Sequence, residues 1–381
     1  MKILHVFTDS FFFESVSIFF DSLDNVDNLY LFYTKKKNYK FSKIRSPQKI
    51  TVVHSYNDYV SNFHRADIDI IYFHSIHFKF YKYFKFIDES KIVIWWCFGT
   101  EIYSKGITNS TIIPLKIYKP LTYSYLKSHL TIRERLISIF RLVFGWHYAS
   151  QRKKAIERVD YFAPVLPQDY YMMKKWCTYL RAKPFMLECG PEAPLSKSFN
   201  YLSTPGNILV GHSLTYTTNL LDILPLFDNI EISKNRKILV PISYGKDYGG
   251  ITNFEEMIHN DNILWLDKII PLPEYTELFK SITHAVFGMI RQQATGNVDL
   301  CICNGVKMFL YKDSIVYQYL KSTGYFVYTI EEDLTAEALI TPLTHKEALH
   351  NYQLLQSKLN NNKEIAEKEL KMMMDSKLRY K

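Results

Sequence analysis

The polar residues from Arg291 to Asn297 have the types and the spacing of an anion-binding loop. They follow the apolar run 285–290 and precede a short apolar segment that we predict to be a helix beginning at Thr295. The first turn of a helix, here with Gly296 and Asn297, offers unbonded backbone N–H groups and a positive dipole end to a phosphate. Arg291 can hold the same anion through two parallel hydrogen bonds. The loop therefore predicts a site for a phosphorylated ligand, and the alternative is a solvated crossover loop.

Polar, turn-forming residues also follow other predicted strands in this half of the chain. They are Gly211, Ser213, Asn219, Ser243 and Tyr244, and beside Arg291 there are also Gln292 and Gln293. Gly211 permits close approach of the backbone to a ligand, and Ser213 can donate a hydrogen bond or cap a helix. Tyr244 can stack on a base or pack within the fold. Ligands of open α/β sheets bind at the carboxyl ends of strands, so we expect these residues around one nucleotide.

Alternating strand and helix signals position these loops. The predicted strands are 2–7, 29–33, 50–54, 69–74, 91–97 and 160–164, then 207–211, 237–241, 262–266, 285–290, 306–311 and 325–328. Such alternation predicts α/β architecture with parallel, doubly wound sheets. Because 191–205 is rich in Pro and Ser, we predict one domain over 1–200 and a second over 206–345. The two domains would face each other across a cleft, followed by a polar helical tail over 346–381.

Composition limits the class of protein. The 381 residues are 47% hydrophobic and 22% charged, as in soluble globular proteins. Five cysteines without framework spacing indicate reduced core thiols. The N-terminus begins directly with an apolar strand, and no run of about twenty apolar residues follows anywhere. We therefore expect a cytoplasmic protein.

A basic segment spans residues 115–158. It holds ten Lys or Arg and two Glu, so eight of the nine net positive charges lie here. Apolar residues within it recur with helical spacing, at Leu136, Ile139, Phe140, Val143 and Phe144. A basic amphipathic helix of this kind either lies on an anionic membrane surface or packs on its own core. We expect no nucleic acid partner, because no base-reading motif accompanies the charge.

Four segments resemble the TDP-N-acetylfucosamine:lipid II N-acetylfucosaminyltransferase family. They are NILVGHSLTYTTN, ILVPISYG, WWCFGTEIY and the stretch 272–311, within a patchy resemblance from about Asp69 to Asp333. The most telling match is Arg291-Gln292-Gln293, followed by Gly296. The chain departs from the family pattern at Leu214 and Tyr216, and Trp96 stands where the family tends to have His.

The resemblance implies a GT-B fold, with two Rossmann-like domains, the donor nucleotide on the second and the acceptor on the first. It implies transfer of 4-acetamido-4,6-dideoxygalactose or a similar sugar from a dTDP-sugar to a polyprenyl-diphosphate-linked glycan, during surface polysaccharide synthesis. The enzyme would be peripheral, on the cytoplasmic face of the inner membrane, and it would need no cofactor.

Sugar transfer also requires a base for the acceptor hydroxyl if configuration inverts. His74 at the end of its strand and Glu101 after the next strand are equal candidates, and Asp169 is a weaker third. The sequence Asp67-Ile68-Asp69 spells a metal-binding Asp-x-Asp, but it precedes its strand and so lies at the wrong end for a cleft. We therefore expect no metal.

Two other classes of function remain open. One is a sugar-nucleotide epimerase or hydrolase of GT-B shape, which needs no lipid acceptor. The other is a non-catalytic protein that binds glycans or sugar nucleotides. Binding of dTDP-, UDP- or GDP-sugars would show which base is preferred, because a ligand stabilises only the fold that binds it.

Overall fold

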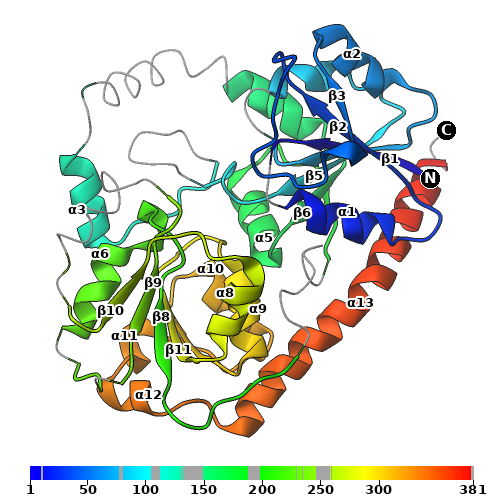
Figure 1. Ribbon diagram of the computed structural model, residues 1–381. Coiled ribbons are helices and arrows are strands. Elements are labelled where there is room, and N and C mark those ends of the chain that lie inside the picture. Colours follow the sequence, from blue (N-terminus) through cyan, green and yellow to red (C-terminus); the bar gives the residue numbers. More distant parts are fainter. Residues whose placement is uncertain are drawn as a thin grey trace. The chain divides into compact units, whose positions relative to one another are not determined.

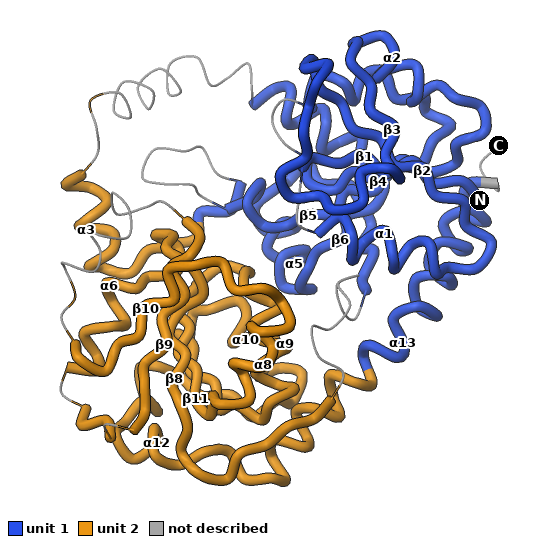
Figure 2. Tube along the Cα trace, viewed as in Figure 1, with its two compact units in different colours: residues 1–114, 133–193, 358–381 blue, residues 115–132, 194–357 orange. Residues whose placement is uncertain are grey.

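The chain forms two compact units. A computed structural model describes residues 1–9, 12–76, 80–103, 112–129, 132, 149–187, 198–228, 230–233, 235–245, 258 and 260–378. Unit 1 comprises residues 1–114, 133–193 and 358–381, and unit 2 comprises residues 115–132 and 194–357 (Figure 2). The ranges 1–200, 206–345 and 346–381 from the sequence differ from this division in two places. Residues 115–132 group with the second half of the chain, and the last helix is shared between the units.

Unit 1 contains a parallel sheet of seven strands in the order β3-β2-β1-β4-β5-β6-β7 (Figure 1). The strands are β1 (Lys2–Phe7), β2 (Asp27–Tyr33), β3 (Ile50–Val53), β4 (Ile70–His74), β5 (Ile92–Cys97), β6 (Tyr161–Pro164) and β7 (Lys183–Pro184). Its helices include α1 (Phe13–Asp21), α2 (Tyr56–Ser61), α5 (Pro167–Trp176) and the last part of α13 (His345–Leu378). The inner strands are apolar throughout, as in β4 and β5, because helices cover both faces of a parallel sheet.

Unit 2 contains a parallel sheet of six strands in the order β10-β9-β8-β11-β12-β13. The strands are β8 (Asn207–Val210), β9 (Ile238–Pro241), β10 (Ile263–Leu266), β11 (Ile282–Phe287), β12 (Lys307–Leu310) and β13 (Tyr328–Thr329). The α-helices among its described residues are α3 (Pro120–Ser128), α6 (Leu220–Ile223), α8 (Leu272–Phe279), α9 (Thr295–Cys303), α10 (Ile315–Ser322), α11 (Ile330–Asp333), α12 (Ala336–Ile340) and the first part of α13.

The last helix is anchored in unit 1 by an apolar stripe. Ala366, Leu370 and Met373 are buried at helical spacing and join the core that α1 forms against β1. The sequence predicted a polar helical tail over 346–381, and α13 covers His345–Leu378. The stripe explains why residues beyond 357 cluster with the first half of the chain.

Strand β11 (Ile282–Phe287) lies three residues earlier than the apolar run 285–290 predicted, because its second and third residues are polar but nevertheless buried. Thr283 and His284 satisfy each other through a 2.8 Å hydrogen bond between Oγ1 and Nδ1. Arg236 approaches the same His284 nitrogen at 3.3 Å. Partners that are distant in sequence thus place polar residues inside a strand.

Both sheets reverse their strand order at one point, between β1 and β4 in unit 1 and between β8 and β11 in unit 2. In doubly wound sheets the crevice at this point, outside the carboxyl ends of the strands, is where ligands bind. The fold class predicted from the sequence, α/β with two Rossmann-like doubly wound units, is confirmed. No helix among the described residues is both long enough and apolar enough to cross a lipid bilayer.

Candidate functional site

The loop after β8 turns sharply at Gly211. Gly211 has a φ of +70°, and a Cβ atom there would lie 2.6 Å from Leu220 Cδ2 and 2.8 Å from Thr218 Cγ2. Only glycine fits this backbone, since side chains with a Cβ rarely adopt that φ and the space is filled.

Hydroxyl groups hold this loop together. Ser213 is buried, and its Oγ lies 3.0 Å from Thr215 Oγ1 and 3.2 Å from Thr218 Oγ1. Thr217 then connects to the loop after β11, because its Oγ1 donates to Gln293 Oε1 at 3.0 Å and its carbonyl accepts from Gln293 Nε2 at 3.1 Å. Because Thr215 Oγ1 lies 3.3 Å from Thr217 Oγ1, a chain of hydroxyl groups connects Ser213 to Gln293, and the Gln293 amide joins the two loops.

Asn219 is the centre of a second set of hydrogen bonds. It is fully buried in the left-handed conformation, with a φ of 53°. Its Oδ1 accepts from Lys119 N at 2.9 Å, and its Nδ2 donates to Ile117 O at 3.1 Å and to Gly288 O at 2.7 Å. The side chain predicted to contact the donor is thus engaged with three backbone groups. We treat Asn219 as a residue that positions the rim.

Helix α9 begins at the same edge of the sheet. The residue before it, Ala294, has a φ of 58° and no side chain caps the helix. The first N–H groups of a helix have no acceptor in the preceding turn. The sequence predicted donors at Gly296 and Asn297, but Asn297 N donates to Ala294 O at 3.0 Å, which leaves the N–H groups of Thr295 and Gly296 at this end. Asn297 Oδ1 accepts from the Tyr275 hydroxyl of α8 at 3.1 Å, and this bond fixes the first turn against its neighbour.

Arg291 and His212 lie close together at this rim. Arg291 is half-buried, and its Nη1 donates to the Gln292 carbonyl at 2.9 Å. The pKa of His212 falls to about 3, first because the ring is buried and second because the Arg291 charge opposes protonation. His212 is therefore a neutral imidazole beside a guanidinium. An anion at this point would therefore be attracted by the Arg291 charge alone, and His212 could only hydrogen-bond it.

Three buried polar atoms along the rim make no hydrogen bond within the part of the chain that the structure describes. They are His212 Nδ1, Gln292 Oε1 and Ser314 Oγ, from the loops after β8, β11 and β12. Backbone bonding ties the last two loops together, because Ile315 N donates to Ile290 O at 2.8 Å. Buried polar groups are nearly always hydrogen-bonded. Three exceptions at one sheet edge indicate that a polar ligand or water completes the site.

Sequence reasoning missed His212 and Ser314. His212 stands inside the quoted segment NILVGHSLTYTTN, between the two residues that were chosen as site candidates. Ser314 precedes α10, where a serine reads as a helix cap, yet its side chain makes no capping bond. The available signal was position alone, since each residue follows a buried strand.

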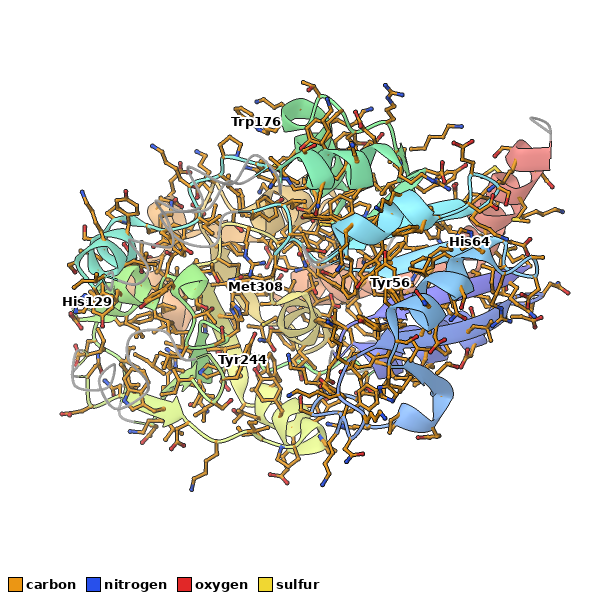
Figure 3. The ribbon with its side chains drawn as sticks, turned by 90° about the horizontal axis from the view of Figure 1, so that it is seen from above. Tyr56, His64, His129, Trp176, Tyr244 and Met308 are labelled. Carbon is orange, nitrogen blue, oxygen red and sulfur yellow. The ribbon has the colours of Figure 1, made fainter. Side chains whose placement is uncertain are left out.

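Ser243 and Tyr244 follow β9. The Tyr244 carbonyl accepts from Leu214 N at 2.8 Å, which connects the loops after β8 and β9. Tyr244 is 58% exposed, and its side chain is labelled in Figure 3. The ring is therefore accessible for stacking.

In unit 1, His74 is enclosed by rings. It is buried, its Nε2 lies 2.9 Å from His5 Nδ1, and its ring stacks on Phe7 with centroids 3.9 Å apart. Burial, with His5 as a second cause, lowers its pKa well below 6.5. A shielded imidazole that resists protonation is a poor base for an acceptor hydroxyl, so these observations favour Glu101 of the two candidates.

Glu101 lies over the carboxyl end of β5 and is half-buried. Its carboxylate accepts from Phe98 N and from Thr100 Oγ1, each at 3.4 Å, and lies 3.8 Å from Cys97 Sγ. Its charge is the second cause, after burial, of the raised pKa of the Cys97 thiol, and Asp169 is the third. Asp169 is buried at the start of α5 and accepts a short hydrogen bond from the Tyr103 hydroxyl. The two carboxylates therefore belong to one polar cluster at this end of the sheet.

The Asp-x-Asp sequence and the basic segment were also singled out from the sequence. Asp67 and Asp69 lie before β4, where Asp67 pairs with Lys2 at 3.0 Å and Asp69 accepts from Lys2 N at 2.8 Å. They lie at the amino end of the strand, as the sequence indicated. The apolar stripe of the basic segment, from Leu136 to Phe144, lies outside the described residues.

Comparison with known proteins identifies the fold. No protein-family model matches the sequence, and a search of curated proteins finds no match. Solved structures do match across nearly the whole length. The apo lipopolysaccharide outer core galactosyltransferase WaaB is 10% identical with a TM-score of 0.59, over 95% of this chain and 99% of that one.

Two further structures agree with this. Sucrose-phosphate synthase from Thermosynechococcus elongatus is 10% identical with a TM-score of 0.57, over 100% of this chain and 98% of that one. An alpha,alpha-trehalose-phosphate synthase (UDP-forming) from Burkholderia xenovorans is 10% identical with a TM-score of 0.56, over 97% and 99% of the two chains. At these identities the likeness shows the fold, and the chain has the GT-B fold of these glycosyltransferases.

Proposed function

We propose that the protein is a glycosyltransferase that uses a nucleotide-activated sugar. The observation that carries the proposal is the set of groups at the carboxyl edge of unit 2. There the half-buried Arg291 guanidinium, the start of α9 and the unbonded His212 Nδ1 and Gln292 Oε1 lie on adjoining loops. The solved structures of the same fold, two of which are synthases of sugar phosphates, support the same class of reaction.

The reaction breaks the bond between the anomeric carbon and the diphosphate oxygen and forms a bond from that carbon to an acceptor oxygen. Negative charge develops on the departing diphosphate, so fixed donors around it lower the barrier. Arg291 and the first N–H groups of α9 supply such donors. His212 Nδ1 and Gln292 Oε1 would hydrogen-bond the phosphate or the sugar hydroxyls, His212 as a donor in the matching tautomer and Gln292 as an acceptor.

The acceptor hydroxyl must lose its proton as the new bond forms. In an inverting reaction we assign that proton to Glu101, since its carboxylate is half-buried and lies at the carboxyl end of β5. His74 is the less suitable group, because it is shielded and its pKa is low.

The specific substrates follow from the resemblance in sequence. We propose a dTDP-activated deoxy-amino sugar such as 4-acetamido-4,6-dideoxygalactose as donor and a polyprenyl-diphosphate-linked glycan as acceptor. The enzyme would then work at the cytoplasmic face of the inner membrane. The exposed ring of Tyr244 would stack on the pyrimidine of the donor.

A thermal-shift series with dTDP, UDP and GDP, and with their sugars, tests the donor site. Arg291→Ala should abolish the shift given by the preferred nucleotide and should reduce transfer by at least about a hundredfold, as loss of one charge-stabilising donor does in other enzymes. Lys280→Ala is the matched control, since Lys280 lies before β11, at the end of that strand remote from Arg291.

Three results would contradict the proposal. They are an unchanged shift in the Arg291 variant, an equal loss in the Lys280 variant, or no shift with any nucleotide. Consumption of the sugar nucleotide with no acceptor present would instead favour the hydrolase or epimerase alternative.

A further inference from the structure

The outward face of α5 in unit 1 combines aromatic rings with lysines. Asp169 and Met173 are buried on the inner side of this helix, and so is Cys177, which directly follows it. On the outer side Tyr171, Lys174 and Lys175 are exposed at the spacing i, i+3, i+4. Tyr171 is 65% exposed, and Trp176, the last residue of the helix, is 48% exposed. Figure 3 shows Trp176 at the outer end of α5.

Further cations extend this face. Lys154 is exposed on the helical residues 149–157, and Arg181 is exposed between α5 and β7. The neighbouring side chains connect these elements, because Lys153 Nζ lies 5.9 Å from the centre of the Tyr179 ring. We call the surface made by Lys154, Tyr171, Lys174, Lys175, Trp176 and Arg181 the α5 surface.

The acidic residues of this region do not offset its charge. Between residues 149 and 184 they are Glu157, Asp160 and Asp169. Glu157 pairs with Lys153 at 3.8 Å, Asp160 pairs with Arg158 at 3.0 Å, and Asp169 is buried. Among the described residues, no carboxylate pairs with a cation of the α5 surface.

The two lysines of α5 are held close to the helix. Lys174 Nζ donates to the Leu180 carbonyl at 3.3 Å, and Lys175 Nζ lies 5.6 Å from the centre of the Trp176 ring. The Lys175 ammonium therefore lies beside the exposed Trp176 ring, and the Lys174 ammonium is held against the backbone that follows the helix. An ordinary solvated helix face carries charges of both signs and few large rings, so this arrangement calls for a partner that is both anionic and apolar.

An anionic lipid bilayer fits both properties. Its head groups carry phosphate, which attracts lysine and arginine near the surface. Trp and Tyr have an apolar ring with a polar tip and favour the boundary between water and hydrocarbon. Lysine stems lie along apolar surface while the ammonium stays at the head groups.

We propose that the α5 surface binds the anionic head-group layer of a bilayer, with Trp176 and Tyr171 inserted at its boundary. None of the residues of this surface belongs to the apolar stripe 136–144. The proposal rests on the proposed function only because a lipid-linked acceptor would require the enzyme to act at a membrane. Vesicle binding needs neither donor nor acceptor, so the two proposals can fail independently.

Co-sedimentation with phosphatidylcholine vesicles, with and without phosphatidylglycerol, tests the proposal. The wild type should sediment only with the anionic vesicles and should be released by high salt. In K174E/K175E we expect the affinity for anionic vesicles to fall by roughly thirtyfold from the loss of the two cations alone. The matched control is K35E/K36E, the same charge change in the exposed loop after β2, which lies four strands away from β6 in the same sheet.

A second measurement locates the contact. Brominated lipids should quench tryptophan fluorescence in the wild type, and W176F should keep vesicle binding while losing most of that quenching. The far-UV circular dichroism of each variant must match the wild type, which excludes unfolding.

The proposal is overturned if the wild type does not bind anionic vesicles, or if K174E/K175E and K35E/K36E lose binding equally. Unchanged quenching in W176F also overturns it. If the wild type ignores vesicles and binds a single-stranded RNA through the same lysines, the surface serves a nucleic acid instead.

Discussion

Replacing Asn219 separates a structural role from a ligand-binding role for this residue. In Asn219→Ala the amide that bonds Lys119 N, Ile117 O and Gly288 O is lost. A buried backbone group left without a partner costs about 1–3 kcal/mol. Alanine held at a φ of 53° adds about 1 kcal/mol of backbone strain. Taking the low end for each term, we expect unit 2 to lose about 4 kcal/mol of stability.

Two further variants separate the contribution of the lost hydrogen bonds from that of the backbone strain. Asn219→Gly removes the same hydrogen bonds but tolerates the left-handed backbone, so it should recover about 1 kcal/mol relative to the alanine variant. Asn219→Asp keeps an acceptor for Lys119 N and places a carboxylate against two carbonyl oxygens. It should therefore be at least as unstable as the glycine variant.

Urea denaturation monitored by circular dichroism measures the free energy of unfolding, and hydrogen exchange with mass spectrometry assigns the loss to a segment. Exchange should accelerate in residues 115–129 and 207–228 before it changes in unit 1. The folded fraction of the glycine variant should still bind the preferred nucleotide. The reasoning is refuted if Asn219→Ala unfolds within about 0.5 kcal/mol of the wild type while losing nucleotide affinity, because the residue would then be a ligand contact.

Three other outcomes are expected. Gly211→Ala should destabilise unit 2 by at least about 2 kcal/mol and abolish nucleotide binding, measured by urea denaturation and thermal shift, because its Cβ would lie 2.6 Å from Leu220 Cδ2; full binding in a stable variant would contradict this. Burial lowers the pKa of His5 from 6.5 to about 4. Between these pH values the unfolded chain binds a proton at His5 that the folded chain does not bind. The contribution of His5 to stability should therefore be complete above pH 6.5 and should fall by about 3 kcal/mol towards pH 4. In urea titrations at stepped pH, His5→Asn should make the slope shallower by that contribution, while the other buried histidines keep theirs, and exposed His64→Asn should leave the slope unchanged. Leu370→Ala should cost unit 1 about 2–5 kcal/mol by leaving a cavity under α13, and an unchanged urea midpoint would show that the helix does not anchor there.

Strands such as β1, β4 and β5 could be predicted from the sequence, because a buried strand is a run of consecutive apolar residues. β1 has the predicted limits, and β4 and β5 differ from the prediction by one residue each. The start of α9 at Thr295 was also predictable, since a polar loop followed by a short apolar segment and Asn304-Gly305 marks both ends of that helix. These features depend on residues that are neighbours in the chain, so they can be predicted from the sequence alone.

Contacts between distant residues decided the rest. Asn219 is a chemically suitable ligand contact until the structure shows its amide bonded to backbone groups from two other segments. His74 ends its strand as predicted, yet the rings of His5 and Phe7 enclose it and lower its pKa. The buried atoms of His212 and Ser314 became visible as site candidates only once their surroundings were known. Burial and hydrogen-bond satisfaction are properties of the packed chain. The sequence by itself therefore determined the α/β fold class, most of the strands and the start of α9, and the tertiary structure decided which side chains remain available to a ligand.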